Sequence, residues 1–360
     1  MTADAKWTAR EATPADVPLL HELAKACHDN SARTVPIKYG VEHTRWQMLE
    51  APAGVYRGLV AIVDGRPAGF YGVVPMRVRC DGRESLAALS LLTMTHPQYR
   101  GRGIFRGLAT RLYADLARYG FAFVYGFPND NSQPTFLSAL GWTHTCDWPV
   151  FVRPLNLPAI ARRVLQRRWV PGPDRPESRG AQPAVPAAGG LREVERFDER
   201  MSAFRAGWED GRRVYIARSA AYMNWRYAAC PDWRYRKVIA ESGQELTGYV
   251  VWRHVEEYGL KGAMIMDLAA AAGRLDVLRD LVRVVVGHAR RDGMDLVSCL
   301  PAGHVDTQRA LRRSLFAKVP ERLSPKKWHF GGRRLDSTMP AEYFNAAASW
   351  HIGFGDCDVM

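Results

Sequence analysis

The stretch that decides the fold runs from Ser85 to Trp142 and reads SLAALSLLTMTHPQYRGRGIFRGLATRLYADLARYGFAFVYGFPNDNSQPTFLSALGW. Its apolar start ends at Thr95, and a turn rich in glycine and arginine follows at once. Residues 104–119 then place leucines at helical spacing. This order predicts a strand, an anion-binding loop and the N-terminus of a helix.

The loop has the chemistry of a phosphate site. Gly101 and Gly103 allow backbone conformations that other residues avoid, so that successive amide N–H groups converge on one anion at the positive end of the helix dipole. A dinucleotide-binding unit is a poorer match, because no acidic residue closes the next predicted strand, Phe121–Phe127. A glycine-rich turn alone is weak evidence, and a plain surface turn is the alternative interpretation.

The order of the flanking parts is more specific than the loop. The hexapeptide QYRGRG at 98–103 resembles the Gln/Arg-x-x-Gly-x-Gly/Ala signature of the GCN5-related N-acetyltransferases, the GNAT superfamily. Pro97, Ile104 and the later order of strand, asparagine, helix and Gly-Trp fit the same family. The resemblance implies an acyl-CoA donor. It places the pantetheine arm beside Thr93, Met94, Thr95 and Asn131, and the pyrophosphate on Arg100, Gly101, Arg102, Gly103 and Ile104.

Composition narrows the class of protein. The chain has 360 residues, enough for two domains, and 47% of them are hydrophobic. It holds no apolar run of the ~18 residues that a membrane helix needs, and its start shows no secretion signal. The six cysteines are scattered, without a Cys-x-x-Cys pair or a zinc-like ligand cluster. These features predict a cytoplasmic protein that uses neither a membrane nor a metal.

The net charge of +13, from 50 basic and 37 acidic residues, indicates anionic partners without naming one. Coenzyme A, a nucleotide-linked sugar, an acidic acyl carrier protein and RNA would all qualify. The alternative is a solvated surface that is rich in arginine.

Residues 171–190 contain five prolines and four glycines and almost no large apolar side chains. Such a segment cannot bury enough surface to fold alone, so it predicts a linker. A basic helix, near Ile160–Trp169, precedes it and carries Arg162, Arg163, Arg167 and Arg168. We therefore predict an acyl-CoA-binding GNAT domain at 1–155, a basic helix and linker at 156–190, and a degenerate GNAT-like domain with an acceptor-site tail at 191–360.

The two halves show one plan. Before the motif, the pattern predicts strands at 7–11, 56–63 and 66–78, with helices at 14–26 and 42–50. Two Asp-Gly pairs, at 64–65 and 81–82, mark hairpin turns. After the linker, strands are predicted at 245–253, 262–268 and 295–300, with a helix at 275–291. The predicted fold class is α+β, with mixed sheets in two GNAT-like domains in tandem.

The second copy is degenerate at the phosphate loop. Its equivalent segment, Ala269–Asp276, has one glycine and no pair of arginines. Donor binding is therefore expected in the first half, and the second half is expected to shape the acceptor site or a homodimer.

The catalytic groups are harder to find. Many GNAT proteins carry a glutamate on the fourth strand as base, but the only carboxylate near Ser85–Thr95 is Glu84 at its start. The position of the family's acid, a tyrosine, is occupied by Leu137, which leaves a free thiolate as the leaving group. His329 is a candidate base with a structural role as its alternative. Asn131 is expected either to donate a hydrogen bond to pantetheine or to cap a turn.

The tail offers paired carboxylates, Asp356 and Asp358, which on an extended strand face one side and would orient an ammonium group. The alternative is a frayed, solvated terminus. Cys357 between them has no evident base beside it and is not expected to react.

The segment around Ser219–Tyr227 is rich in arginine and aromatic residues. With the Gly-Asp-x-Asp ending, it resembles two-domain GNAT proteins that act on nucleotide-linked amino sugars. The candidate residues for the nucleotide are Arg218, Trp225, Arg226 and Tyr227; the alternative places the aromatic residues in the core.

The resulting hypothesis is an N-acyltransferase that moves an acyl group, such as acetyl, from acyl-CoA to the primary amine of a nucleotide-linked amino sugar. A second hypothesis replaces CoA by an acyl carrier protein that docks on Arg162–Arg168, with a peptide or antibiotic intermediate as acceptor. A third is an aminoacyl-tRNA-dependent transferase or a non-catalytic binder. An intact phosphate loop argues against a nucleic-acid partner, since RNA recognition would not need one.

Overall fold

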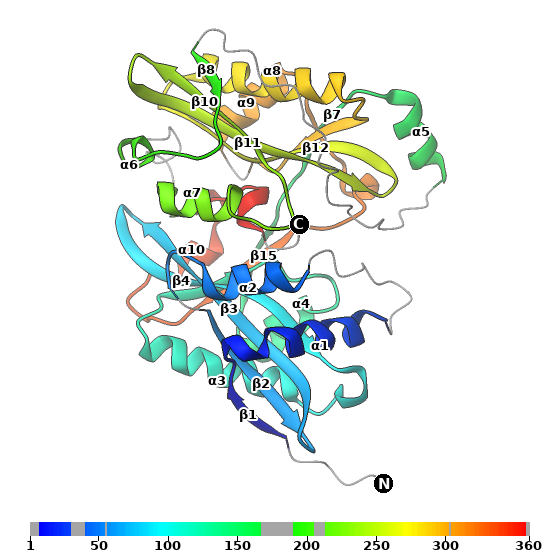
Figure 1. Cartoon of the computed structure of the whole chain (residues 1–360), viewed down its shortest axis with the longest axis vertical. Coiled ribbons are helices and arrows are strands. Elements are labelled where there is room, and N and C mark those ends of the chain that lie inside the picture. The colour runs from blue at the N-terminus through cyan, green and yellow to red at the C-terminus, as the bar shows by residue number, and fades with distance from the viewer. Residues whose placement is uncertain are drawn as a thin grey trace. The chain divides into compact units, whose positions relative to one another are not determined.

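The computed structural model describes residues 7–29, 40–54, 56–166, 190–204, 213–301 and 304–357. Contacts divide the chain into two compact units, and each unit is assembled from two segments. The first unit is Met1–Cys146 with Trp328–Ala346, and the second is Asp147–Lys327 with Ala347–Met360 (Figure 1). Most of the predicted linker, together with Arg167 and Arg168, lies outside the described residues. Among the helices that are described, none combines the length and the apolar character needed to cross a bilayer.

The first unit is built on a mixed sheet in the order β1-β2-β3-β4-β5-β15-β6. Strands β1 to β4 are antiparallel, β5 runs parallel to β4, and β15 is antiparallel to β5. The strands are β1 (Thr8–Glu11), β2 (Arg57–Val63), β3 (Arg66–Cys80), β4 (Arg83–Thr95), β5 (Phe123–Gly126), β6 (Thr143–Asp147) and β15 (His329–Arg334).

Both predicted hairpin turns are present. Asp64 and Gly65 have φ of 47° and 74°, and Asp81 and Gly82 have φ of 47° and 78°. Two successive residues with positive φ match the right-handed twist of the strands, and Asp-Gly is a favoured pair for this turn. The pairs therefore join β2 to β3 and β3 to β4 as the sequence predicts.

Helices cover this sheet. Helix α3 packs on β2, β3 and β4, while α1 packs on β3 and β4 and also against α2. Figure 1 shows α1 and α2 in front of the strands. Ile104, Leu108, Leu112 and Leu116 are buried on one stripe of α3, and each apolar side chain contributes about 1.5–3 kcal/mol. The helices are α1 (Val17–Asp29), α2 (Val41–Leu49), α3 (Ile104–Arg118), α4 (Gln133–Leu140) and α10 (Glu342–Asn345).

The second unit repeats the plan with the sheet order β14-β7-β13-β12-β11-β10-β8. Helix α8 buries Leu281, Val282 and Val285 completely against this sheet. The strands of this sheet are β7 (Phe151–Pro154), β8 (Leu191–Glu193), β10 (Arg236–Ser242), β11 (Glu245–Glu257), β12 (Leu260–Ala270), β13 (Leu296–Cys299) and β14 (Ala317–Lys318). Two short strands outside it, β9 (Val214–Ile216) and β16 (Trp350–His351), pair with each other. The helices are α5 (Leu157–Gln166), α6 (Arg200–Ala203), α7 (Ala220–Tyr227), α8 (Leu275–Arg291) and α9 (Val305–Arg313).

The two units exchange strands. β7 follows β6 in sequence, yet it pairs with β13 and β14 of the second sheet. β15 follows the second sheet in sequence, yet it lies between β5 and β6 of the first. Each unit is therefore discontinuous, which differs from the continuous ranges 1–155 and 191–360 that composition suggests. The composition of a segment predicts a linker, but it carries no information on which sheet edge a later strand joins.

Candidate functional site

In the first unit, β4 and β5 part after a short paired stretch. The two strands pair only from Ala87 with Phe123 to Leu89 with Tyr125. Just beyond, β4 bulges at Leu92, whose φ is 48°, while its other edge stays paired with β3. The length Ser90–Thr95 is thus without ladder bonds to β5, and its backbone can pair with an extended ligand. Thr93, Met94 and Thr95, which were predicted to line the donor, lie on this length.

The predicted phosphate loop joins this strand to α3. Gly101 and Gly103 have φ of 79° and 71°, and Gly103 is the N-cap of α3. A Cβ on either glycine would have no atom of the described chain within 4 Å. Arg102 lies over the ring of Tyr99, at 5.4 Å from its centroid, and Arg100 donates to the carbonyl oxygen of Thr95 at 3.4 Å. An open, positive helix N-terminus therefore follows the length of β4 that is free of β5.

The turn after β5 is organised by Asn129. Its Oδ1 accepts the backbone N–H groups of Asn131 and Ser132 at 3.1 and 2.9 Å. Asn131, the residue singled out in the sequence, is exposed in this turn. The side chain that caps the turn is thus Asn129, and a role of Asn131 toward pantetheine stays a prediction.

His329 comes to the end of β5 from far along the chain. β15 pairs Gly331 with Gly126, so that His329 lies beside the turn that follows β5. Its Nε2 is 2.6 Å from Oδ1 of Asp130, and the imidazole is buried while the carboxylate is exposed. A carboxylate on one ring nitrogen fixes the orientation of the imidazole.

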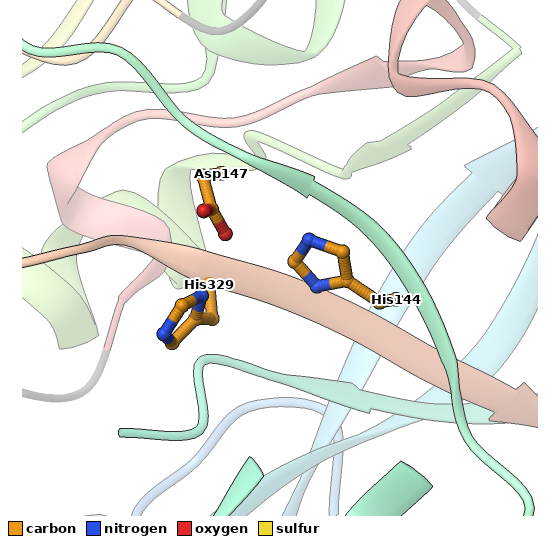
Figure 2. A group of neighbouring side chains, drawn as sticks. All are labelled: His144, Asp147 and His329. Atoms are coloured by element: carbon orange, nitrogen blue, oxygen red, sulfur yellow. The ribbon is translucent and has the colours of Figure 1, made fainter. Parts of the chain in front are cut away.

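Figure 2 shows His329 among neighbouring side chains of β6. The rings of His144 and His329 are 5.8 Å apart, and Gln133 contacts Nδ1 of His144 at 3.0 Å. Asp147, three residues after His144, ends the same strand, and one ligand atom from each of the three lies within 4.8 Å of the others. Sequence spacing had not revealed this group. That the chain carries no metal stays a prediction, because imidazole and carboxylate are zinc ligands.

Glu84 is placed away from the parting of β4 and β5. Its carboxylate is exposed at the start of β4, where it accepts a hydrogen bond from Arg77 at 2.6 Å. Ala87 to Leu89, the residues paired with β5, separate it from the unpaired length of the strand. A role of Glu84 as base stays a prediction, although its carboxylate lies before the paired residues and Thr93–Thr95 lie after them.

The predicted nucleotide residues of α7 are interior residues of the second unit. Arg218, Trp225, Arg226 and Tyr227 are 2–8% exposed. Arg218 donates to Asp267 at 3.1 Å and to Asp356 at 2.7 Å, so its charge is already paired. Arg226 donates to the carbonyl oxygen of Gly355 at 3.0 Å and to the hydroxyl of Tyr235 at 3.1 Å. The expectation of a nucleotide grip is corrected: the arginines hold the C-terminal tail.

The prediction that the tail carboxylates orient an amine is corrected in the same way. Asp356 is 1% exposed, ends a short 3-10 turn (Phe354–Asp356) and accepts the N–H of Gly353 at 2.8 Å. It is neither on an extended strand nor open to an amine. Asp358 lies outside the described residues. Burial raises the pKa of the Asp267 carboxyl, and the charge of Arg218 opposes that rise.

The second unit has a counterpart of the parting of β4 and β5, and its own tail lies there. β12 and β13 pair as far as Ile265 with Cys299, and β12 then bulges at Met266. A Cβ on Gly353 would lie 2.9 Å from the carbonyl oxygen of Met266. A small pocket remains there, lined by Asp267, His304, Thr307 and His351 among others. The tail thus lies against the bulge of β12, and the expectation that this copy binds no donor stays a prediction.

A buried hydroxyl chain was missed in the sequence. Ser90, Tyr71 and Tyr113 are linked by hydrogen bonds, and Trp142 donates to Tyr113. The four residues come from β3, β4, α3 and the segment after α4, so no spacing pattern connects them. The only sequence signal is the presence of polar aromatic residues on otherwise apolar faces.

Comparison with known proteins gives one family match within the first unit. A family model described as an acetyltransferase (GNAT) domain matches residues 8–145. No curated protein matches the chain.

Solved structures match both units. N-myristoyltransferase of Saccharomyces cerevisiae, with bound myristoyl-CoA and inhibitors, has a TM-score of 0.61 at 12% identity over 92% of this chain and 80% of that one. A probable N-acyltransferase of Enterococcus faecalis gives 0.59 at 13% over 92% and 72%. A GCN5-related N-acetyltransferase of Anabaena variabilis gives 0.56 at 12% over 92% and 73%. At such identities the similarity establishes the fold alone.

Proposed function

We propose that the protein, whose residues 8–145 match a family model described as an acetyltransferase (GNAT) domain, is an N-acyltransferase that moves an acyl group from acyl-CoA to a primary amine. The observation that carries the proposal is the parting of β4 from β5 after Leu89, followed along the chain by Gly101 and Gly103 at the N-terminus of α3. An extended arm fits the free edge of β4, and a pyrophosphate fits the helix end. The acyl-CoA bound in the yeast N-myristoyltransferase agrees with this class of donor.

In the reaction, the amine nitrogen bonds to the thioester carbonyl carbon, the C–S bond breaks with its electron pair going to sulfur, and the amine loses a proton. We assign the proton to His329, whose ring is oriented by Asp130 at 2.6 Å. The backbone N–H groups of Thr93–Thr95 are the proposed donors to the oxyanion, since they lie on the length of β4 that is free of β5.

The acceptor is proposed as a primary amine. A nucleotide-linked amino sugar is the first class to test, on the resemblance of the α7 segment to sugar-modifying relatives. The residues predicted to bind the nucleotide, Arg218 and Arg226, instead donate hydrogen bonds to Asp356 and Gly355 inside the second unit. The acceptor is therefore to be identified with a panel that also includes peptide and antibiotic amines.

No observation favours a carrier-protein donor or tRNA over acyl-CoA. Of the basic residues proposed for docking, Arg163 donates to the carbonyl oxygen of Gly259. Assembly of the chain into a homodimer stays a prediction.

The test is titration with acetyl-CoA in a calorimeter, followed by longer acyl chains. We expect one-to-one binding by the wild type and at least tenfold weaker binding by Gly103→Trp, because the indole would fill the space beside the helix N-terminus. Gly65→Trp is the matched control: its φ is 74° against 71°, and it also has no atom of the described chain within 4 Å of its Cβ. Equal affinity of the two variants would refute the donor site, and no binding by the wild type would refute the donor class.

A further inference from the structure

Ser90 lies where β4 parts from β5. It follows Leu89, the last residue of β4 that pairs with β5. It still touches β5, since a Cβ on Gly126 would lie 3.3 Å from Cβ and the carbonyl oxygen of Ser90. The serine is half-buried, whereas Leu89 and Leu91 on either side are buried. Its hydroxyl is therefore placed where the two strands separate.

A chain of hydrogen bonds leads to this hydroxyl from the core. Trp142 Nε1 donates to the hydroxyl of Tyr113 at 2.9 Å. The hydroxyls of Tyr113 and Tyr71 are 2.8 Å apart, and that of Tyr71 is 3.0 Å from Oγ of Ser90. Both tyrosines are almost completely buried, at 3% and 0% exposure.

The direction of the chain follows from its inner end. The indole N–H of Trp142 can only donate, so the oxygen of Tyr113 is an acceptor there. If Tyr113 donates to Tyr71, and Tyr71 donates to Ser90, every buried hydroxyl proton is used within the described part of the protein. The reverse order would leave the buried proton of Tyr113 unpaired, at a cost of about 1–3 kcal/mol. The chain therefore points outward, and Ser90 has its own O–H to donate where the strands part.

The phenols act as donors and keep their protons. Burial raises the pKa of Tyr71 to about 12, and burial also raises the pKa of Tyr113 well above its usual value. The chain thus strengthens the donor character of Ser90 through successive polarisation, without passing a proton along it.

We propose that Ser90 donates a hydrogen bond to the sulfur of the donor as the thiolate leaves, with Tyr71 as its positioning residue. This role rests on the proposed function. As the C–S bond breaks, its electron pair goes to sulfur, which accepts the Ser90 hydrogen bond and leaves as the thiolate; the amine proton goes to the base. The backbone of Thr93–Thr95, which does not pair with β5, remains for the carbonyl oxygen. Hydrogen bonds to charged groups are the stronger class, which suits a donor aimed at a thiolate.

The test compares coenzyme A with desulfo-coenzyme A, which has hydrogen in place of the thiol, and needs no acceptor. Affinities are measured by calorimetry near pH ~9.5, above the ~8.5 typical of a thiol. We expect Ser90→Ala to lower the affinity for coenzyme A about tenfold and to leave the affinity for desulfo-coenzyme A unchanged. Ser90→Thr keeps the hydroxyl and should restore the affinity. Tyr71→Phe should lower the affinity for coenzyme A by a smaller factor and again leave the affinity for desulfo-coenzyme A unchanged.

Ser85→Ala is the matched control, because it makes the same substitution on β4 before the residues paired with β5. It should change neither affinity. Circular dichroism of each variant checks that the fold is kept. The proposal is overturned if Ser90→Ala leaves coenzyme A binding unchanged, or weakens both ligands equally. If the wild type binds neither ligand, the proposed function fails first and the role of Ser90 falls with it.

Discussion

Asp267 and Asp356 share a single arginine inside the second unit. Arg218 is 8% exposed and reaches both carboxylates, while Tyr227 and Tyr249 donate to Asp267 at 3.4 Å. At the residue scale this explains why the arginine-rich segment of the sequence is not a ligand grip. A buried guanidinium between two carboxylates has no charge left over for a phosphate, and the same contacts hold the tail in place.

Replacing this arginine should be strongly destabilising. Arg218→Met leaves two buried carboxylates without a cation, which typically costs about 3–5 kcal/mol of unfolding free energy. Arg274→Met removes the exposed pair with Asp276 and should cost less than about 1 kcal/mol. Urea unfolding of the two variants and the wild type measures both values. Equal stability of the two variants would contradict the assignment of Arg218 to a structural network.

The base assignment is also tested at single residues. His329→Gln should lower kcat about 100-fold with the best acceptor of the panel, because a positioned base contributes about that much or more. Asp130→Asn should lower kcat less, since it only orients the ring. His144→Gln, at the neighbouring ring on β6, is the control and should leave kcat within a few-fold of the wild type. Steady-state rates decide, and a full rate in His329→Gln would exclude this base.

At the scale of elements, β10 and α8 of the second unit meet through a buried histidine. His288 on α8 is 1% exposed, and its Nδ1 accepts from Nη1 of Arg236 at 2.8 Å. Arg236 in turn pairs with Glu193 of β8 at 2.8 Å. Because Nδ1 is an acceptor here, the imidazole is held in its neutral form.

This contact makes the stability of the second unit depend on pH. Burial, together with the charges of Arg236 and Arg291, lowers the pKa of His288 to about 4, against the opposing charges of Asp292 and Glu193. The unfolded chain titrates near ~6.5, so it binds more protons than the folded chain between these values. The contribution of His288 to the unfolding free energy is therefore complete above about pH 6.5 and falls as the pH drops toward 4.

Urea unfolding at pH ~4.5 and ~7.5 measures this slope. The loss of stability on acidification should be smaller in His288→Gln, which cannot titrate, than in the wild type. An equal loss in both proteins would show that other groups cause it.

The elements themselves were largely predictable. The helix at 275–291 and the strand–loop–helix around Gly103 follow from spacing and glycine positions, and both are observed. The bulges at Leu92 and Met266 were not foreseen, although they lie where β4 parts from β5 and β12 from β13. A bulge depends on the pairing of two strands, and the pattern along one strand does not record it.

At the scale of the whole molecule, the strand exchange makes each unit depend on both ends of the chain. β15 lies between β5 and β6, so the first sheet is incomplete without residues 328–346. The same exchange brings His329 to the end of β5. The base candidate thus enters the first unit only when the C-terminal segment has joined its sheet.

The dependence can be tested with fragments. Residues 1–155 alone should not give a cooperatively folded domain, because they expose the edges of β5 and β6 and carry β7, which pairs only in the second sheet. Residues 1–146 joined to 328–346 by a flexible linker should fold and bind acetyl-CoA. Amide dispersion in NMR spectra and calorimetry compare the two fragments. A well-folded 1–155 fragment would argue that β15 is dispensable for the first unit.

The sequence by itself determined the donor motif, the helices and hairpins around it, and the duplication of the plan. These follow from local causes: helical and strand periodicity, the conformational freedom of glycine, and the turn preference of Asp-Gly pairs. Only the tertiary structure decided that β7 and β15 change sheets, that Arg218 and Arg226 are interior, and that His329 and Ser90 lie at the ends of the β5 pairing. Burial of a charge or pairing of a strand edge is set by segments more than a hundred residues away, which act on free energy and leave no local pattern.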